Sequence, residues 1–122
     1  MSGRITTHVL DLSQGKPAAG MHVQLWLLPE NNELHRLVKA VVTNEDGRLD
    51  SPLLEKEELQ PGLYQLVFSV ADYFRERGSM LVHESQLFLD EVPVRFRVTD
   101  SNAHYHVPLL VAPGGYSTYR GS

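Results

Sequence analysis

The segment HYHVPLLVAPGGYSTYRGS, residues 104–122, decides the fold. Its first half alternates in polarity, and successive side chains of a β-strand point to opposite faces of the sheet. The apolar set, which we expect to face a core, is Tyr105, Val107, Leu109 and Val111. The opposite set, which we expect on an outer face, is His104, His106, Pro108 and Leu110. The segment therefore predicts a core strand whose two histidines point outward.

The same two-residue period recurs upstream, between stretches rich in turn-forming residues. We predict strands at residues 5–11, 21–28, 34–43, 63–70, 92–98, 104–111 and 116–119, and a short edge strand at 48–53. Loops or turns are predicted at 13–20, 29–32, 44–47, 61–62, 99–102 and 113–115. A short helix is predicted at 71–78, where Gly78 would end it. Seven to eight strands with one helix predict an all-β sandwich of two antiparallel sheets, in one domain over residues 1–122.

Composition excludes several classes of protein. The chain has no cysteine, which excludes disulfides, thiolate metal sites and a cysteine nucleophile. Its net charge of −4 argues against a nucleic-acid partner, because such domains usually carry a basic excess. No stretch approaches the roughly 20 apolar residues that cross a bilayer, and residues 1–8 lack the apolar core of a signal peptide. We therefore expect a cytoplasmic protein with no membrane partner.

The first strand adds a third outward histidine. Ile5, Thr7 and Val9 form its core set, so His8 points outward. If the first and last strands share a sheet, one outer surface carries His8, His104 and His106, and no carboxylate among them. Tyr119 would lie on the same surface, and Arg48, which follows the Asp-Gly turn, would reach it from a loop.

The residues alone leave more than one reading of this surface. Outward histidines on strands are usually solvated, and an arginine after a turn is usually a surface cation. Two imidazoles that project the same way from one strand can bind zinc, although His8 would have to supply a third ligand. Catalysis by the histidines is the other functional reading. The terminal residues favour a site, because most termini are poorly ordered polar tails, whereas this one offers two rings, a guanidinium, a hydroxyl and a carboxylate.

Three segments resemble a known family. They are TTHVLD at 6–11, NEDGR at 44–48, and HYHVPLL at 104–110 followed by YSTYRGS at 116–122. Through them the chain resembles the 5-hydroxyisourate hydrolases, the transthyretin-like enzymes of purine breakdown. Transthyretin, a hormone carrier of the same fold, shares the Tyr-Ser-Thr segment but lacks the Tyr-Arg-Gly-Ser ending and the histidine-rich strand. The similarity extends from about Ile5 to Ser122.

The resemblance implies a transthyretin-like sandwich that assembles as a homotetramer, a dimer of dimers, with active sites in a channel between facing sheets. The implied substrate is 5-hydroxyisourate, and the implied reaction is hydrolytic ring opening to 2-oxo-4-hydroxy-4-carboxy-5-ureidoimidazoline, without a cofactor or a metal ion. The family's catalytic residues carry over onto His8, Arg48, His106 and Ser122. Its substrate-binding residues carry over onto His8, Arg48, His104, Tyr119, Arg120 and Gly121.

With no cysteine and no serine nucleophile motif, direct attack by water is the economical mechanism. Either His8 or His106 would act as general base, and Arg48 would stabilise developing negative charge. Tyr119 would orient the substrate, and Ser122 with its carboxylate would order the water or hold His106. Two other functions stay open: a carrier that binds a small aromatic ligand in the same channel without turnover, and a purely structural domain of a larger assembly.

Overall fold

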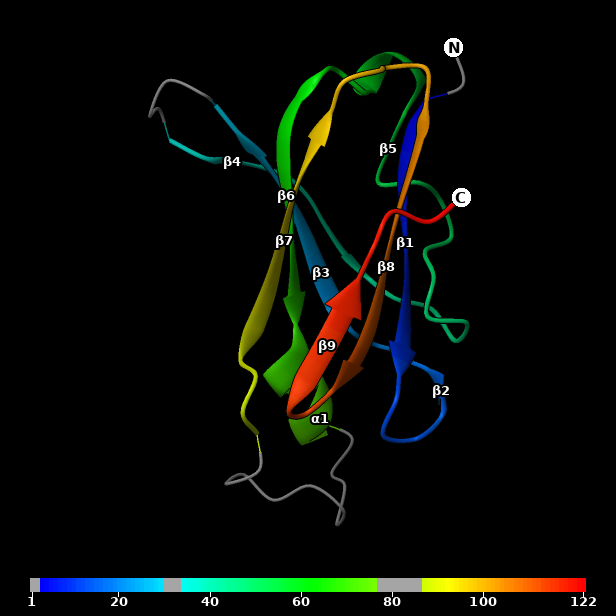
Figure 1. Cartoon of the computed structure of the whole chain (residues 1–122), viewed down its shortest axis with the longest axis vertical. Coiled ribbons are helices and arrows are strands. Elements are labelled where there is room, and N and C mark those ends of the chain that lie inside the picture. The colour runs from blue at the N-terminus through cyan, green and yellow to red at the C-terminus, as the bar shows by residue number, and fades with distance from the viewer. Residues whose placement is uncertain (1–2, 30–33, 77–86) are drawn as a thin grey trace.

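The computed structural model describes residues 3–29, 34–76 and 87–122, which form two β-sheets packed face to face (Figure 1). In chain order the elements are β1 Arg4–Asp11, β2 Lys16–Pro17, β3 His22–Leu28, β4 Arg36–Val42, β5 Leu54–Glu55, the 3₁₀ helix η1 Lys56–Glu58, β6 Gly62–Ser69, α1 Val70–Glu76, β7 Glu91–Val98, β8 His104–Ala112 and β9 Gly115–Thr118. One sheet has the order β2-β1-β8-β9, with β5 paired to the start of β1. The other has the order β4-β3-β6-β7.

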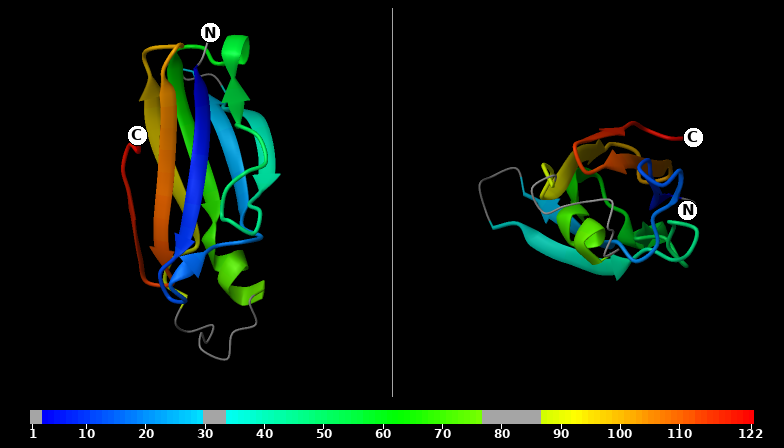
Figure 2. Two further views of the ribbon diagram at one scale, coloured as in Figure 1. Left: turned by 90° about the vertical axis from the view of Figure 1, so that its right-hand side faces the viewer. Right: turned by 90° about the horizontal axis from the view of Figure 1, so that it is seen from below.

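The core lies between the two layers, which Figure 2 shows from the side and from below. Strands β1 and β8 alternate as their sequences predict, so that Ile5, Val9 and Leu109 are fully buried. They pack in one cluster with Leu25 and Phe68 of the opposite sheet. Each side chain of this size contributes roughly 1.5–3 kcal/mol when it is fully buried, and this burial holds the sheets together.

The predicted two-sheet sandwich with one short helix is confirmed, with two corrections to its pairing and edges. The first is that β1 and β8 run parallel. They are separated by most of the chain, so no tight turn forces them to be antiparallel. The second concerns the edges: Lys16–Pro17, predicted as loop, pairs with the end of β1. Residues 48–53, predicted as an edge strand, form bends before β5 begins at Leu54.

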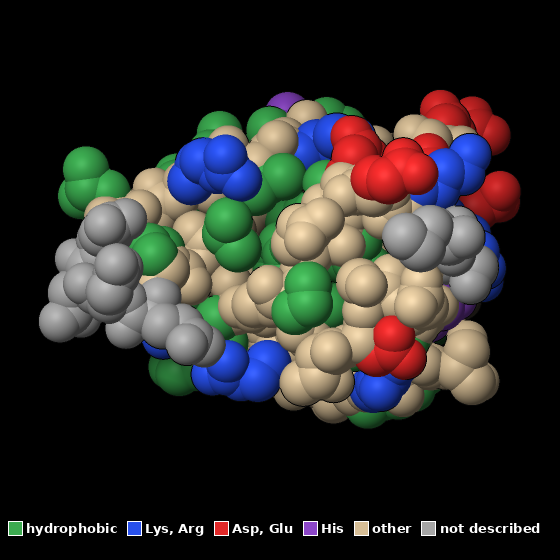
Figure 3. Space-filling model, turned by 90° about the horizontal axis from the view of Figure 1, so that it is seen from above, with side chains coloured by type: hydrophobic (Ala, Val, Ile, Leu, Met, Phe, Trp, Pro, Cys, Tyr) green, Lys and Arg blue, Asp and Glu red, His purple; other side chains and the backbone are tan. Residues whose placement is uncertain are grey.

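Other predictions fall partly outside the described residues. Helix α1 begins at Val70, one residue earlier than expected, and Gly78 lies outside the described part of the chain. The same holds for most of the turn predicted at 29–32. No helix in the described ranges is long and apolar enough to cross a membrane. At the end of the molecule seen in Figure 3, acidic side chains gather at one corner beside basic ones.

Pro108 lies in the same row of β8 as the two histidines, paired with His8 of β1, as predicted. Its side chain is nevertheless buried within the chain. Strand β9 lies along this part of β8, and the Thr118 hydroxyl donates to the Pro108 carbonyl at 2.7 Å.

The Asp-Gly turn is locked against β1 by a glycine. Gly47 has φ +71°, and its carbonyl accepts a hydrogen bond from the Val9 N–H at 2.8 Å. A Cβ added at Gly47 would lie 2.3 Å from the Val9 carbonyl oxygen. Only glycine permits both the positive φ and this close approach. The turn therefore fixes the residue that follows it, Arg48, beside the first strand.

Three glycine-to-alanine variants separate the two constraints. Gly47→Ala should lower the free energy of unfolding by about 2–4 kcal/mol, because it adds a steric conflict to an unfavourable φ. Gly15 has a φ of +67°, but an added Cβ would meet nothing within 4 Å, so Gly15→Ala should lower the free energy of unfolding by about 1 kcal/mol. Gly114→Ala has neither constraint and should change stability by less than about 0.5 kcal/mol. Urea unfolding measures all three, and equal losses for Gly47→Ala and Gly15→Ala would contradict the close approach to Val9.

Candidate active site

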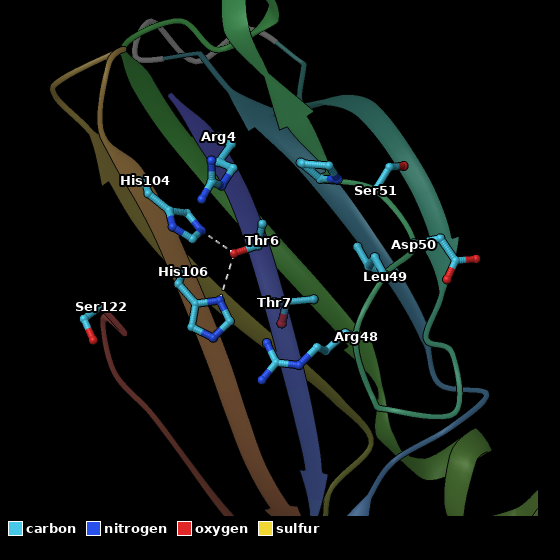
Figure 4. A pocket seen from close by; sticks show the side chains of 11 residues that line it. Arg4, Thr6, Thr7, Arg48, Leu49, Asp50, Ser51, His104, His106 and Ser122 are labelled. Carbon is cyan, nitrogen blue, oxygen red and sulfur yellow. Dashed lines mark hydrogen bonds between the residues drawn. The ribbon is translucent and has the colours of Figure 1, made fainter. Parts of the chain in front are cut away.

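The parallel pairing of β1 and β8 places their outward side chains in adjacent rows. Arg4 pairs with His104, and Thr6 pairs with His106. The Thr6 hydroxyl oxygen lies 2.6 Å from Nε2 of His104 and 2.8 Å from Nδ1 of His106 (Figure 4). The two imidazole rings stand 5.9 Å apart, centre to centre. One hydroxyl group therefore joins two histidines on the outer face of the sheet.

A pocket of about 300 Å³ opens over these rows. Its floor comes from β1 and β8, one wall from residues 48–52, and a further part from the C-terminal residue, Ser122. Figure 4 shows Thr6, Arg48 and His106 directed toward the same space. Most of the lining groups are polar or charged, with Leu49 and Pro52 as the apolar members.

Arg48 is held by the Asn44 turn. The Asn44 N–H donates to the Arg48 carbonyl at 2.8 Å, and the Arg48 N–H donates back to Oδ1 of Asn44 at 3.1 Å. The Arg48 guanidinium points toward His106 in Figure 4, whereas the Asp50 carboxylate points away. Nδ2 of Asn44 donates to that carboxylate at 2.9 Å. The turn thus presents a cation to the histidines and holds the Asp50 carboxylate elsewhere.

The electrostatics of the pocket favour neutral imidazoles. Burial, followed by the charges of His104, Arg48 and His8, lowers the pKa of His106 from its ordinary value of 6.5. Burial and the cations Arg4 and Arg120 lower the pKa of His104. Burial and Arg48 also lower the pKa of His8, although a backbone hydrogen bond and the charge of Asp46 act in the opposite direction. A neutral imidazole has a free nitrogen lone pair, so these rings can accept protons near neutral pH.

The C-terminal segment packs against this pair of histidines. The Gly121 N–H donates to the His106 carbonyl at 2.8 Å, and a Cβ at Gly121 would lie 2.5 Å from Cδ2 of the His106 ring. The Arg120 guanidinium donates to the His104 carbonyl at 3.2 Å and lies over the Tyr105 ring at 4.3 Å. These contacts, which need a glycine at position 121, bring Ser122 to the pocket.

Comparisons with known proteins agree with this arrangement. The HIUase/Transthyretin family model matches residues 5–121. The chain belongs to this family. The 5-hydroxyisourate hydrolase of Halalkalibacterium halodurans is 59% identical over 122 residues, which is 100% of each chain. The resemblance predicted from three sequence segments is confirmed.

Two solved structures place the fold. A crystal structure of (S)-allantoin synthase matches with a TM-score of 0.89 at 42% identity, covering 99% of this chain and 44% of that one. The transthyretin of Sparus aurata matches with a TM-score of 0.83 at 21% identity, covering 97% of this chain and 96% of that one. The transthyretin match shows a shared fold, and it confirms the transthyretin-like sandwich.

The structure brings together most of the residues predicted for the site. Arg48, His104, His106 and Ser122 line one pocket, and His8 acts electrostatically on His106. Tyr119 does not line this pocket. It is 61% exposed and, with Arg120, borders a second hollow near Tyr105 and β7. The expectation of no carboxylate nearby is also wrong, because Asp50 lines the pocket and Asp46 acts on His8.

The sequence reading missed Thr6 and Arg4. Both share the outward face of β1 with His8, so the two-residue period already placed them on that surface. Their contacts depend on the register between β1 and β8, which the period does not give. Among the described residues, no group of three or more histidine, cysteine, aspartate or glutamate side chains could hold a metal ion.

The imidazoles of His8, His104 and His106 should titrate below pH 6.5 in the folded protein. Histidine NMR signals followed from pH 8 to pH 4.5 measure this directly. Because folding lowers these pKa values, the unfolded chain binds more protons as the pH falls below about 6.5. The free energy of unfolding should therefore decrease over that range and be fully recovered above it. Titration of His106 above pH 6.5 would contradict the cationic environment described here.

Proposed function

We propose that this protein is a 5-hydroxyisourate hydrolase, a hydrolase of urate catabolism. The family match and the named activity of its full-length relative support this substrate. The observation that carries the proposal is the pocket itself, where Arg48, His104 and His106 meet. Water adds to an amide-like carbonyl of the six-membered ring, the ring opens, and 2-oxo-4-hydroxy-4-carboxy-5-ureidoimidazoline is released.

The proposed mechanism uses a neutral histidine as general base. His8 or His106 takes a proton from the attacking water, and such assistance contributes roughly 10²–10⁴-fold in rate. The lowered pKa values of both rings support this role, because they keep a lone pair available at neutral pH. Arg48 stabilises the negative charge that develops on the attacked carbonyl oxygen. Two hydrogen bonds to Asn44 hold its backbone, which fixes the point from which the side chain extends.

The remaining residues bind and orient the substrate. The substrate is bound by groups beside the outward side chains of β1 and β8, namely His104, Arg120 and Gly121. Ser122 supplies a hydroxyl and a carboxylate that order the water or hold His106. Tyr119 is assigned to substrate orientation through its place in the assembled channel. No cofactor or metal ion takes part in this mechanism.

The pocket lining favours an enzyme over a carrier. A carrier of a small aromatic ligand needs a mainly apolar channel, whereas this pocket presents guanidinium, imidazole and hydroxyl groups. These groups are the ones that can accept protons and stabilise charge.

The proposal includes a homotetramer, built as a dimer of dimers, in which two outer sheet faces enclose the pockets. Leu10 and Leu110 support it, since both are half-buried apolar side chains on the face that carries the pocket. Apolar groups beside an open polar pocket are typical of a surface that a second copy covers. A cytoplasmic location stays a prediction from the sequence.

Arg48→Ala and His106→Ala should each lower the rate of 5-hydroxyisourate hydrolysis by roughly 10²-fold or more. Purified protein is mixed with freshly generated substrate in the presence of a strong chelator, and the decay of the substrate is followed. Matched controls are Arg36→Ala and His22→Ala, which remove an exposed arginine and an exposed histidine from the other sheet. The controls should keep the parental rate. If all four variants lose activity only in proportion to folded protein, the assignment of the pocket is wrong.

Sedimentation should give a mass about four times that of the 13.8 kDa chain. Leu110→Glu should dissociate the tetramer, because it places a charge on the proposed contact face, and activity should fall with the assembled fraction. Glu57→Gln, an exposed change on η1, serves as the control. A monomer that is stable and fully active would refute the enclosed channel.

A further inference from the structure

The contact between Thr6 and the two histidines constrains where protons can sit. A hydroxyl group has one proton to donate and two lone pairs to accept with. Thr6 lies within hydrogen-bond distance of Nε2 of His104 and of Nδ1 of His106. It can donate to only one of these nitrogens, so the other nitrogen must carry a proton and donate to Thr6.

Three arrangements of neutral rings satisfy this rule. In the first, Nε2 of His104 donates to Thr6 and the hydroxyl donates to Nδ1 of His106, so both rings are protonated at Nε2. In the second, Nδ1 of His106 donates to Thr6 and the hydroxyl donates to Nε2 of His104, so both rings are protonated at Nδ1. In the third, Nε2 of His104 and Nδ1 of His106 both donate to the two lone pairs of Thr6, and the hydroxyl proton points elsewhere. The hydroxyl couples the tautomers of the two rings in the first two arrangements, where it donates to one of them.

The distances favour the second arrangement. A hydroxyl donor generally gives a shorter contact than a nitrogen donor. The shorter contact, 2.6 Å, is to His104, and the longer, 2.8 Å, is to His106. This order matches a hydroxyl that donates to His104 and accepts from His106.

We propose that Thr6 is a positioning residue that holds His104 and His106 as Nδ1-protonated tautomers and leaves Nε2 of His106 as the free proton acceptor. The assignment of tautomers stands on geometry alone, and only the use of the free nitrogen rests on the proposed function. Of the two candidate bases, His106 is the one whose ring orientation is fixed in this way. Gly121, packed against the ring at Cδ2, restricts it from another side.

The proton balance of the reaction follows from this assignment. As the water oxygen bonds to the carbonyl carbon, a water O–H bond breaks and an N–H bond forms at Nε2 of His106. The resulting imidazolium keeps its Nδ1–H bond to Thr6, which stabilises the charge. When the ring C–N bond breaks, the departing nitrogen takes the proton from Nε2. The new carboxyl group releases its proton to solvent, and His106 returns to its starting tautomer.

The tautomers can be read from the unmodified protein. Nitrogen-15 NMR of histidine-labelled protein, at a pH where the rings are neutral, distinguishes a protonated from an unprotonated ring nitrogen. We expect protonated Nδ1 and unprotonated Nε2 for both His104 and His106. Protonated Nε2 on His106 overturns the proposal, whatever the activity. The expected spectrum in a protein that does not hydrolyse 5-hydroxyisourate leaves the tautomers standing and removes the proposed function.

Variants at Thr6 test the consequence. Thr6→Val keeps the shape of the side chain but removes the hydroxyl, and should lower kcat by about 10- to 100-fold while KM changes less than about 3-fold. The His106 nitrogen signals should shift toward the Nε2-protonated form. Thr6→Ser restores the hydroxyl and should restore both kcat and the spectrum.

Thr43→Val is the matched control, because it removes a threonine hydroxyl from a hydrogen bond elsewhere in the fold, the one donated to the Ala18 carbonyl at 2.6 Å. It should reduce stability but leave kcat and the histidine signals unchanged. If Thr6→Ser is as impaired as Thr6→Val, or if Thr6→Val keeps the parental kcat, the hydroxyl does not position His106 and the proposal is wrong.

Discussion

The parallel pairing of β1 with β8 is the constraint on which both the core and the candidate site depend. Its register sets Ile5 beside Tyr105 on the inner face and Thr6 beside His106 on the outer face. Because side chains alternate with a period of two, a slip of one residue would exchange the two faces. Such a slip would bury imidazoles and expose core residues together. The free energy that forms the core therefore also enforces the alignment of the site.

Contacts at different points along the two strands hold them to each other and to neighbouring elements. The Thr7 hydroxyl donates to the Val107 carbonyl at 2.7 Å inside the core, one residue from the histidine contact. At the far end of β1, the buried Asp11 carboxylate accepts from the Tyr73 hydroxyl at 2.8 Å, which ties the strand to α1. The C-terminal segment adds the bond from Gly121 to His106. These groups are far apart in sequence, so the site forms only when the whole sandwich has folded.

The sequence predicted the faces of the strands well and their partners poorly. Alternation in β1 and β8 is local information, and it correctly placed His8, His104 and His106 on the outer side. The direction of β1 relative to β8 depends on a connection of about ninety residues. The local alternation of side chains does not determine that direction. The contact of Thr6 with both rings follows from that register, so the sequence could place Thr6 outward but could not give its role. Tyr119 lies beyond the end of β9 at Thr118, where strict alternation ends, so the two-residue period does not fix the direction of its side chain.

The charge of the pocket serves the reaction in two opposite ways. Arg4 and Arg120 disfavour protonation of His104, and Arg48 disfavours protonation of His106, which keeps a base available. The same cations favour the oxyanion of the transition state. They also attract the carboxylate of the proposed product, and a deeply buried site of this charge would release it slowly. Arg48, which lines the pocket, is exposed in the single chain, and water weakens that attraction. An open rim around half-buried histidines thus combines a desolvated base with a product that can leave.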